Sequence, residues 1–424
     1  MIIITSEFLD KNWSSLKDNS FVEAYFSEWD EGDTYTLLDI GPLSSKHITK
    51  GIICLESDCV NSCKIKIRLN RFENDAPDYS YLSQYGDKYH ISALIMKGNS
   101  HQEGSIKIEN ISHNLTLRRK GILESEILKD KVVLIIGLGT GGIFVAQELA
   151  KCGVGNFIFV DNDRLEAGNI VRHSAGISCI GRKKINVAAD LVREIDPSIN
   201  VEKHSIRAEE QSKELMHKLI NSSDLVICAT DSRPSKLFIN AICVEEKKTV
   251  ILGGAFRRAY GGQIIRVRPN ESACYHCFVM SMPDKEADME ISSQENVDAV
   301  AYSDQPVVAE PGLSLDVAPI SLMVSKLALQ ELIKDKQTTL HILDDDFKVA
   351  WYLWLNRPES GTQYSNLPPL SDSIDEMTIL RWYGIELEKE IYCPTCGDFE
   401  KGLKDTYNIK SDVADLPGLP EGKL

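Results

Sequence analysis

The feature that most constrains this chain is a run of β-branched residues that ends in a glycine-rich turn. Residues 131–136 read KVVLII, and such a continuous apolar run is typical of a strand buried on both faces of a parallel sheet. The turn Gly137-Leu-Gly139-Thr-Gly141-Gly142 follows, and a helical pattern begins after it. Gly137 permits a tight turn, Gly139 lets the backbone approach a phosphate, and Gly142 lets the helix pack close to the strand. The sequence therefore predicts a phosphate-binding strand–turn–helix unit.

Strand and helix patterns continue to alternate beyond this unit. The expected strands lie at 156–160, 224–229 and 249–253, and the expected helices at 142–152 and 181–195. This order predicts an α/β fold with a Rossmann-like, doubly wound sheet and right-handed crossovers.

Two further parts flank the predicted sheet. Residues 1–115 show strand-like runs between charged turns and carry no motif with chemistry, so we predict a small N-terminal α+β domain. Within it, residues 8–29 are interpreted as one or two short helices. Residues 116–400 form the predicted nucleotide-binding domain, and residues 401–424 are expected to be a flexible tail.

Charge and hydropathy narrow the class of partner and the compartment. The 424 residues include 47 Lys and Arg against 63 Asp and Glu, a net charge of −16. A cationic face for nucleic acid or an anionic membrane is therefore not expected. The N-terminus lacks the pattern of a signal peptide, and the longest apolar stretch, 319–333, is too short to span a bilayer and carries Lys326. We interpret that stretch as a buried helix and expect a cytoplasmic protein.

A series of polar residues follows the glycine turn. Asp161 ends the second expected strand, where an acid suits a pair of ribose hydroxyls, and so far an NAD(P)-dependent oxidoreductase is the obvious interpretation. A dehydrogenase has no need of Asn169, Arg172, Lys184 and Asp231, which come next. An enzyme that binds a nucleoside triphosphate does need such residues, because three phosphates and a metal require several cations and a carboxylate. The series therefore favours a nucleoside triphosphate.

These residues together resemble the ThiF/MoeB/ubiquitin-activating-enzyme superfamily. The family pattern is a glycine loop, an acid at the end of the second strand, Asn-x-x-Arg, Gly-x-x-Lys and a later Thr-Asp, and all five parts occur in that order. The resemblance extends over residues 118–333 and a second cysteine pair near the C-terminus. It implies ATP-dependent adenylation of a carboxylate and a homodimer.

The resemblance also implies roles for single residues. The residues that would bind ATP are Gly137, Gly139, Gly142, Asp161 and Asn169. The residues that would be catalytic are Arg172 and Lys184, which would neutralise charge on the triphosphate, and Asp231, which would bind Mg²⁺. An arginine from the partner subunit often joins the site in this family, and Arg118 or Arg119 is the candidate. A solvated basic turn is the alternative for these two arginines.

Two cysteine pairs predict a zinc site. Cys274 and Cys277 form one C-x-x-C, and Cys393 and Cys396 form another. Each pair can place two thiolates on one side of a tight turn, and four thiolates complete a tetrahedral Zn²⁺ site with no open position. Such a site is structural and would fasten the C-terminal segment to the core. Unrelated thiols or disulfides remain the alternative.

A cysteine is missing where related enzymes form a thioester or relay sulfur. No cysteine occurs in residues 278–392, and residues 309–313 read AEPGL where MoeB-like proteins often carry Cys-x-x-Ala-Gly. This departure favours the family members that modify ribosomal precursor peptides to make microcin- and pantocin-type antibiotics. The alternatives are MoeB-like activation of a small ubiquitin-like or sulfur-carrier protein, a non-catalytic nucleotide-binding module, and the NAD(P) oxidoreductase.

Overall fold

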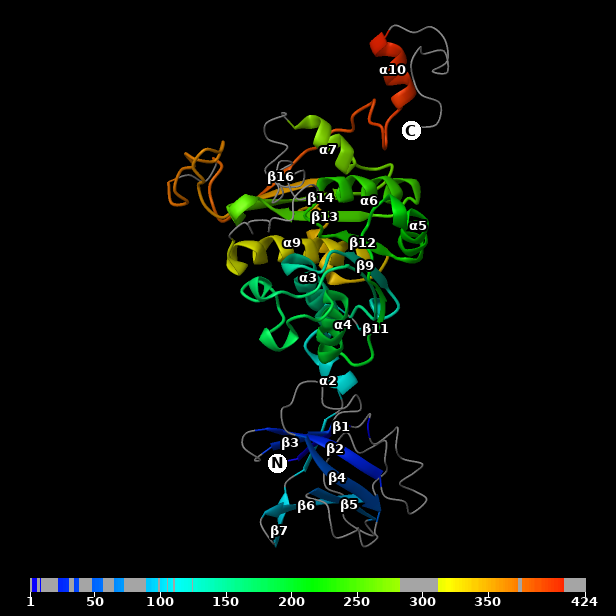
Figure 1. The fold of residues 1–424 in the computed structure, drawn as a ribbon, viewed down its shortest axis with the longest axis vertical. Helices are drawn as coiled ribbons and strands as arrows, with labels where there is room; N and C mark the ends of the chain where they lie inside the picture. The colour runs from blue at the N-terminus through cyan, green and yellow to red at the C-terminus, as the bar shows by residue number, and fades with distance from the viewer. Residues whose placement is uncertain are drawn as a thin grey trace. The chain divides into compact units, whose positions relative to one another are not determined.

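The computed structural model divides into two compact units, Met1–Lys120 and Gly121–Leu424. Each unit is described by itself (Figure 1). The described residues are 2–5, 8, 22–29, 34–37, 48–55, 65–71, 89–97, 100–104, 106–109, 111–123, 125–282, 312–372 and 376–407.

The first unit is built on a mixed sheet of eight strands in the order β7-β6-β5-β4-β2-β3-β1-β8. The strands are β1 (Ile2–Thr5), β2 (Val22–Trp29), β3 (Thr34–Leu37), β4 (Ile48–Leu55), β5 (Ile65–Arg71), β6 (Tyr89–Lys97), β7 (Ser100–Gly104) and β8 (Ile106–Glu109). Helix α2 (Ile111–Leu117) follows them. The interpretation of residues 8–29 as helical is wrong for 22–29, because β2 pairs antiparallel with both β3 and β4.

The second unit holds another eight-stranded sheet, in the order β11-β10-β9-β12-β13-β14-β15-β16. Its strands are β9 (Val132–Ile136), β10 (Asn156–Val160), β11 (Asn200–His204), β12 (Leu225–Cys228), β13 (Val250–Ala255), β14 (Gly261–Val267), β15 (Trp351–Leu355) and β16 (Arg381–Ile385). The first five along the chain, β9 to β13, are parallel, and β14 to β16 extend the sheet antiparallel.

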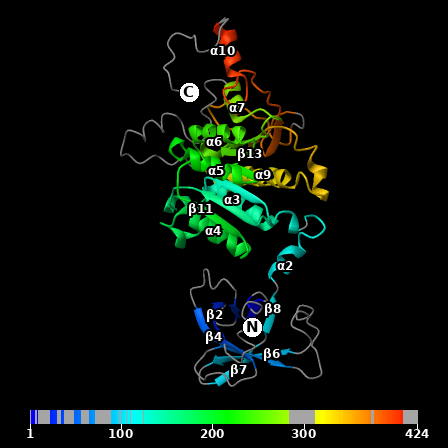
Figure 2. The same ribbon diagram turned by 90° about the vertical axis from the view of Figure 1, so that its right-hand side faces the viewer.

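Helices cover both faces of this sheet. They are α3 (Thr140–Cys152), α4 (Lys184–Ile195), α5 (Lys213–Ser222), α6 (Arg233–Glu245), α7 (Tyr275–Ser281) and α9 (Ser314–Ile333). Apolar residues of α3, α4 and α9 share one core, and those of α5, α6 and α7 share the other. Figure 1 shows α6 and α9 on opposite sides of β13, and Figure 2 shows α3, α4 and α9 in the view turned by 90°.

The sequence predicted this layered arrangement correctly. The Rossmann-like α/β sheet is confirmed, with each expected strand found within about two residues of its predicted bounds. The apolar stretch 319–333 is part of α9, which is largely buried. One difference concerns the expected tail, because residues 401–407 belong to helix α10 (Phe399–Tyr407). The rest of that tail, 408–424, lies outside the described residues.

Candidate functional site

A cavity of about 970 Å³ opens at the carboxyl ends of four neighbouring parallel strands. The chain leaves β9 into the glycine turn, β10 into Asp161, β12 into Asp231, and β13 through Gly253 and Gly254. Ligands of open α/β sheets bind at this edge, because the loops that leave the strands there diverge. The volume lies in the range of ligand sites, about 300–1,000 Å³. We call it the nucleotide cavity.

The glycine turn forms one wall of this cavity. Gly137 has φ +89°, and a Cβ there would lie 2.7 Å from the carbonyl oxygen of Ala229. Gly139 precedes the first residue of α3, lines the cavity, and would place a Cβ in open space. The missing side chain therefore leaves the backbone N–H groups of the first turn of α3 accessible to an anion.

Gly142 lies behind the turn. A Cβ on Gly142 would approach the carbonyl oxygen of Gly137 to 1.9 Å, so only glycine lets α3 pack this closely on the turn. Gly142 is not among the described residues that line the cavity. Direct contact between Gly142 and ATP stays a prediction.

Asp161 is buried beside the glycine turn. Its carboxylate accepts hydrogen bonds of 2.7 Å from the backbone N–H of Leu138 and of 2.7 Å from that of Asp163. Burial raises the pKa of Asp161, while these two hydrogen bonds and the positive charge of Lys184 act in the opposite direction. Each carboxylate oxygen keeps a second lone pair, so Asp161 can fix the turn and still accept from a ligand hydroxyl.

His173 holds the same turn from the other side. Its Nδ1 accepts from the N–H of Ala175 at 3.0 Å, so the proton of the neutral ring is on Nε2, which lies 3.1 Å from the carbonyl oxygen of Leu138. Burial lowers the pKa of His173. These contacts make His173 a neutral positioning residue for Leu138 rather than a proton-transfer group.

The expected cations lie along the same cavity. Lys184 begins α4 and forms an ion pair of 2.9 Å with Asp163, and only 12% of its side chain is exposed. Arg172 follows the short helical turn that ends at Asn169. A Cβ on Gly312, ahead of α9, would lie 3.6 Å from Arg172 Nη1. The structure thus brings Asn169, Arg172 and Lys184 into one lining.

Asp231 reaches the cavity from the end of β12. Its side chain is exposed and lines the cavity just before α6, whose first turn is capped by a 3.4 Å hydrogen bond from the N–H of Ser235 to Ser232 Oγ. This exposed carboxylate offers the kind of oxygen donor that Mg²⁺ prefers.

Arg118 and Arg119 belong to the first unit and are not among the described residues that line the cavity. They lie in the turn after α2, with Arg118 exposed and Arg119 partly buried. An action on the cavity of a partner subunit stays a prediction.

The sequence interpretation missed Asp163, which pairs with Lys184. Its position two residues after Asp161, in the same loop, is the feature of the sequence that could have indicated Asp163 as a site residue. It also missed the segment after β11, where Arg207, Glu209 and Glu210 line the cavity, because that segment matches no part of the family pattern.

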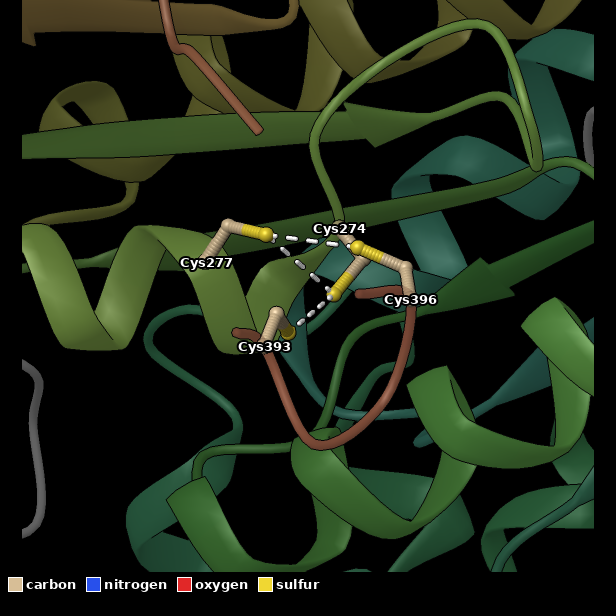
Figure 3. A group of neighbouring side chains, drawn as sticks. All are labelled: Cys274, Cys277, Cys393 and Cys396. Atoms are coloured by element: carbon tan, nitrogen blue, oxygen red, sulfur yellow. Dashed lines mark hydrogen bonds between the residues drawn. The ribbon is translucent and has the colours of Figure 1, made fainter. Parts of the chain in front are cut away.

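The four cysteines of the two C-x-x-C pairs form a closed cluster (Figure 3). Cys274 and Cys277 lie at the start of α7, and Cys393 and Cys396 lie in a turn ahead of α10. The four sulfur atoms lie within 4.8 Å of one another, and three pairs are separated by 3.3, 3.6 and 3.9 Å. A tetrahedral zinc with Zn–S bonds of about 2.3 Å separates its sulfurs by about 3.8 Å. The cluster therefore fits Zn²⁺.

The environment of the sulfurs agrees with a metal site. The thiol of Cys274 donates to Cys277 Sγ, which holds the pKa of Cys277 at about 4 and raises the pKa of Cys274. Asn240 of α6 accepts from the N–H of Tyr275 at 2.9 Å and so fixes the turn that presents the first pair. The site joins residues 119 apart in the sequence.

No helix among the described residues is long and apolar enough to cross a membrane.

Comparison with protein families gives one match that covers more than half of the chain. The model of the ThiF family matches residues 111–346. Among curated proteins, ubiquitin-like modifier-activating enzyme 5 from Caenorhabditis briggsae is 29% identical over 175 residues, which cover 39% of this chain and 40% of that protein. The enzyme of the same name from Drosophila mojavensis is 30% identical over 176 residues, 39% of this chain and 44% of that protein. The matches thus span less than half of either relative.

Two solved structures are similar at low identity. The structure of E. coli MccB with ATP has a TM-score of 0.45 and 17% identity, and the match covers 64% of this chain and 68% of that one. The structure of PaaA has a TM-score of 0.42 and 18% identity, covering 55% of this chain and 71% of that one.

Proposed function

The chain belongs to the ThiF family, and we propose that it uses ATP to adenylate a carboxylate of a ribosomally made precursor peptide in the biosynthesis of a peptide natural product. The family confirms the resemblance predicted from the sequence. The observation that carries the proposed activity is the convergence of a glycine turn, two cations and two carboxylates on one cavity. We infer from it that the chain is an ATP-dependent adenylyltransferase.

The proposed first step needs charge neutralisation rather than a base. A peptide carboxylate is ionised near neutral pH, with an unperturbed pKa of about 4, so it can attack without losing a proton. Its oxygen bonds to the α-phosphorus of ATP, the bond from that phosphorus to the bridging oxygen breaks, and pyrophosphate leaves. Arg172 and Lys184 would relieve the repulsion between the anions and hold them in line.

The nucleotide would lie along the sheet edge with its ribose at Asp161. Its phosphates would then follow the glycine turn towards Asn169, Lys184 and Arg172. Asp231 would hold Mg²⁺, which supplies further charge neutralisation when bound.

The proposed second step is capture of the acyl adenylate by a nearby nitrogen. The nitrogen bonds to the acyl carbon, AMP leaves, and the nitrogen loses a proton. The absence of cysteine from residues 278–392 of the sequence supports this outcome, because a thioester would need a nucleophilic thiol beyond the first cysteine pair.

Activation of a small ubiquitin-like or sulfur-carrier protein is the second candidate. It is favoured by the relatives named ubiquitin-like modifier-activating enzyme 5. In this case the acyl adenylate of the C-terminal residue would pass to a separate enzyme, and no internal cysteine is required.

Further parts of the proposal concern the setting of the site. We infer that the unit Met1–Lys120 is a clamp that grips the peptide, that the second unit forms a homodimer, and that Arg118 or Arg119 enters the partner's cavity. We also infer that Zn²⁺ occupies the four-cysteine cluster and fastens the segment before α10 to α7. The reaction would take place in the cytoplasm, where ATP is available.

ATP–pyrophosphate exchange tests the proposed activity. The protein is incubated with Mg-ATP, labelled pyrophosphate and either candidate precursor peptides or a ubiquitin-like protein ending in Gly-Gly. We expect label in ATP that depends on one of these acids and is lost in Lys184→Ala. Peptide-dependent exchange supports the first candidate, and exchange only with the Gly-Gly protein supports the second. Absence of exchange with every acid, with ATP bound, would identify a non-catalytic module. Binding of NADH without exchange would refute the proposal.

A further inference from the structure

An amide side chain of α6 lies buried beside the four-cysteine cluster. Asn240 is fully buried, and its Oδ1 accepts the 2.9 Å hydrogen bond from the backbone N–H of Tyr275, the residue that follows Cys274. A backbone N–H can only donate, so the atom that faces it must be the oxygen of the amide. This contact fixes the orientation of the Asn240 side chain and places its Nδ2 on the other side of the amide.

The Nδ2 atom of Asn240 is a donor that lacks an acceptor. It is buried and makes no hydrogen bond to any of the residues that the structure describes. An unsatisfied buried donor is costly and rare in native proteins, so its presence calls for an explanation. Because the amide nitrogen carries two donors and no acceptor, the group that completes it must be an acceptor.

The sulfur of Cys274 is the candidate acceptor. The hydrogen bond to Cys277 and burial raise the pKa of Cys274, whereas the side chain of Asn240 acts to lower it. The amide is therefore close enough to this sulfur to favour its charged form. In the metal-free protein the thiol of Cys274 donates its own proton to Cys277 Sγ at 3.9 Å. When a metal ion takes the place of that proton, the sulfur can only accept.

Charge balance in the cluster calls for such donors. Zn²⁺ carries two positive charges and four thiolates carry four negative ones, so the bound site holds two negative charges in excess. Three of the four cysteines are buried, and a buried charge must be paired or hydrogen-bonded. One donor is already in place, because the backbone N–H of Glu390 donates to Cys277 Sγ at 3.4 Å. Asn240 would supply another donor, at the sulfur of Cys274.

The same helix also buries a positive charge near the first cysteine pair. Lys236 lies one turn before Asn240 on α6 and is 2% exposed. Its Nζ lies 6.0 Å from the centre of the Tyr275 ring, and Tyr275 follows Cys274. Residues four apart lie on one face of a helix, so the amide and the ammonium group share a face of α6. That face suits an anionic neighbour better than four neutral thiols.

We propose that Asn240 is a positioning residue for the metal site, in which Nδ2 donates a hydrogen bond to the zinc-bound thiolate of Cys274 while Oδ1 holds the turn that carries this cysteine. The assignment rests on the proposed occupancy of the cluster by Zn²⁺ and is independent of the proposed adenylation. Loss of an outer hydrogen bond of this kind typically weakens metal binding about 10–100-fold, which sets the size of the expected effect.

The first experiment measures the zinc affinity of the full chain by competition with a chelator. Asn240→Asp keeps the size of the side chain and the oxygen that accepts from Tyr275, and it replaces the donor by a second oxygen. We expect Zn²⁺ to bind about 10–100-fold more weakly at about pH 8. Ile239→Val is the matched control, because it trims the neighbouring buried residue of α6 and leaves the amide in place. Its zinc affinity should stay within about twofold of the wild type.

The pH dependence separates a hydrogen bond from an effect of packing. Burial and the neighbouring thiolates raise the pKa of the carboxyl group that Asn240→Asp introduces, so acid returns a proton that can be donated to the sulfur. The ratio of the wild-type zinc affinity to that of the variant should therefore shrink as the pH falls from about 8 to about 6. Asn240→Leu cannot donate at any pH, so its ratio should stay constant. This second variant also carries the test if Asn240→Asp does not fold.

The second experiment reads the electron density of the sulfurs. Co²⁺ in place of Zn²⁺ gives a sulfur-to-metal charge-transfer band, and a hydrogen bond to a thiolate lowers the energy of the lone-pair electrons that this band excites. Loss of the bond in Asn240→Leu, or in Asn240→Asp at about pH 8, should shift the band to longer wavelength. Ile239→Val should leave the band in place.

The possible failures of this proposal can be told apart. Zinc affinities of Asn240→Asp and Asn240→Leu within about twofold of the wild type, or an equal loss in Ile239→Val, would overturn the role of Asn240 and leave the zinc site intact. A charge-transfer band at the same wavelength in all variants would have the same consequence. A wild-type protein that binds neither Zn²⁺ nor Co²⁺ at the cluster would refute both the zinc site and this assignment. None of these results bears on adenylation, which ATP–pyrophosphate exchange tests separately.

Discussion

The nucleotide cavity and the four-cysteine cluster gather residues from distant parts of the chain in opposite ways. In the cavity, charged side chains from the segments after β10, β11 and β12 line an open space, and Lys184 forms an ion pair with Asp163, whose side chain is 56% exposed. In the cluster, three of four cysteines are buried and the sulfurs already face one another. The cavity leaves room for a ligand, whereas the cluster leaves room only for an ion.

This difference predicts that the cavity residues serve the reaction and that the cluster residues serve the stability of the fold. Removing a charge from the cavity should impair the reaction and leave the fold intact. Removing a sulfur from the cluster should impair the fold and leave the chemistry of the remaining folded molecules intact. Each of the following predictions tests one side of that separation.

The largest effect is expected at the cluster. Cys393→Ser replaces a fully buried cysteine of the cluster and should abolish binding of the proposed Zn²⁺, at a cost of about 4–5 kcal/mol, the upper range for a single substitution. At about 2–4 °C per kcal/mol, the melting temperature should fall by about 8–20 °C. Calorimetry and metal analysis of the purified protein measure both quantities.

The control for this variant is a cysteine outside the cluster. Cys152→Ser changes a partly buried thiol at the end of α3 and should keep the metal content of the wild type. A Cys393→Ser protein with unchanged metal content and melting temperature would contradict the structural role of the cluster.

The second effect is expected at Lys184. Lys184→Ala removes a cation from the cavity and should lower the exchange rate about 10²–10³-fold, as loss of one preorganised electrostatic contact does. Its melting curve should match the wild type. Lys183→Ala alters the preceding residue, which makes no side-chain cap for α4, and should retain the wild-type rate. Equal rates for the two variants would remove Lys184 from the catalytic machinery.

A smaller effect is expected at Asp163. Asp163→Asn keeps the shape of the side chain but removes the charge that holds Lys184 in place. An exposed ion pair contributes about 0.2–1 kcal/mol, so the catalytic rate should fall at most about fivefold. Asp190→Asn removes a comparable ion pair with Arg182 on the outer face of α4 and should have no effect on the rate. A loss as large as that of Lys184→Ala would show that Asp163 itself contacts the substrates.

The sequence predicted the parts of the second unit whose physical cause is local. The run 131–136 and the glycine turn fix β9, the turn and the start of α3, because a continuous apolar strand and a positive φ at Gly137 each restrict the backbone. Convergence of Asp161, Lys184 and Asp231 could also be expected, since parallel strands end at one edge of a sheet.

Features that depend on tertiary contacts were not predictable. The partner of Lys184 and the hydrogen bonds of His173 depend on how the loop after β10 folds back on Leu138. A smaller cavity of about 470 Å³ is lined by residues of β14 to β16, α7 and the loop after β15, and no spacing in the sequence relates these elements. In the first unit, β2 was mistaken for a helix because its identity depends on pairing with β3 and β4.

The smallest effect concerns the pH dependence of the glycine turn. Burial lowers the pKa of His173 below the ordinary value of 6.5, so below about pH 6.5 the unfolded chain binds a proton that the folded chain does not. Stability is therefore fully present only well above pH 6.5 and declines as the pH falls towards the lowered pKa of His173, by at most about 0.4 kcal/mol between pH 7.5 and 6.5. His173→Gln, which does not titrate, should flatten this slope in urea unfolding experiments.

His341→Gln is the matched control, because hydrogen bonds to Lys336 and Asp344 raise the pKa of His341. A raised pKa stabilises the fold at low pH, so His341→Gln should steepen the decline. Equal flattening by both variants would show that protonation of His173 is not what loosens the turn.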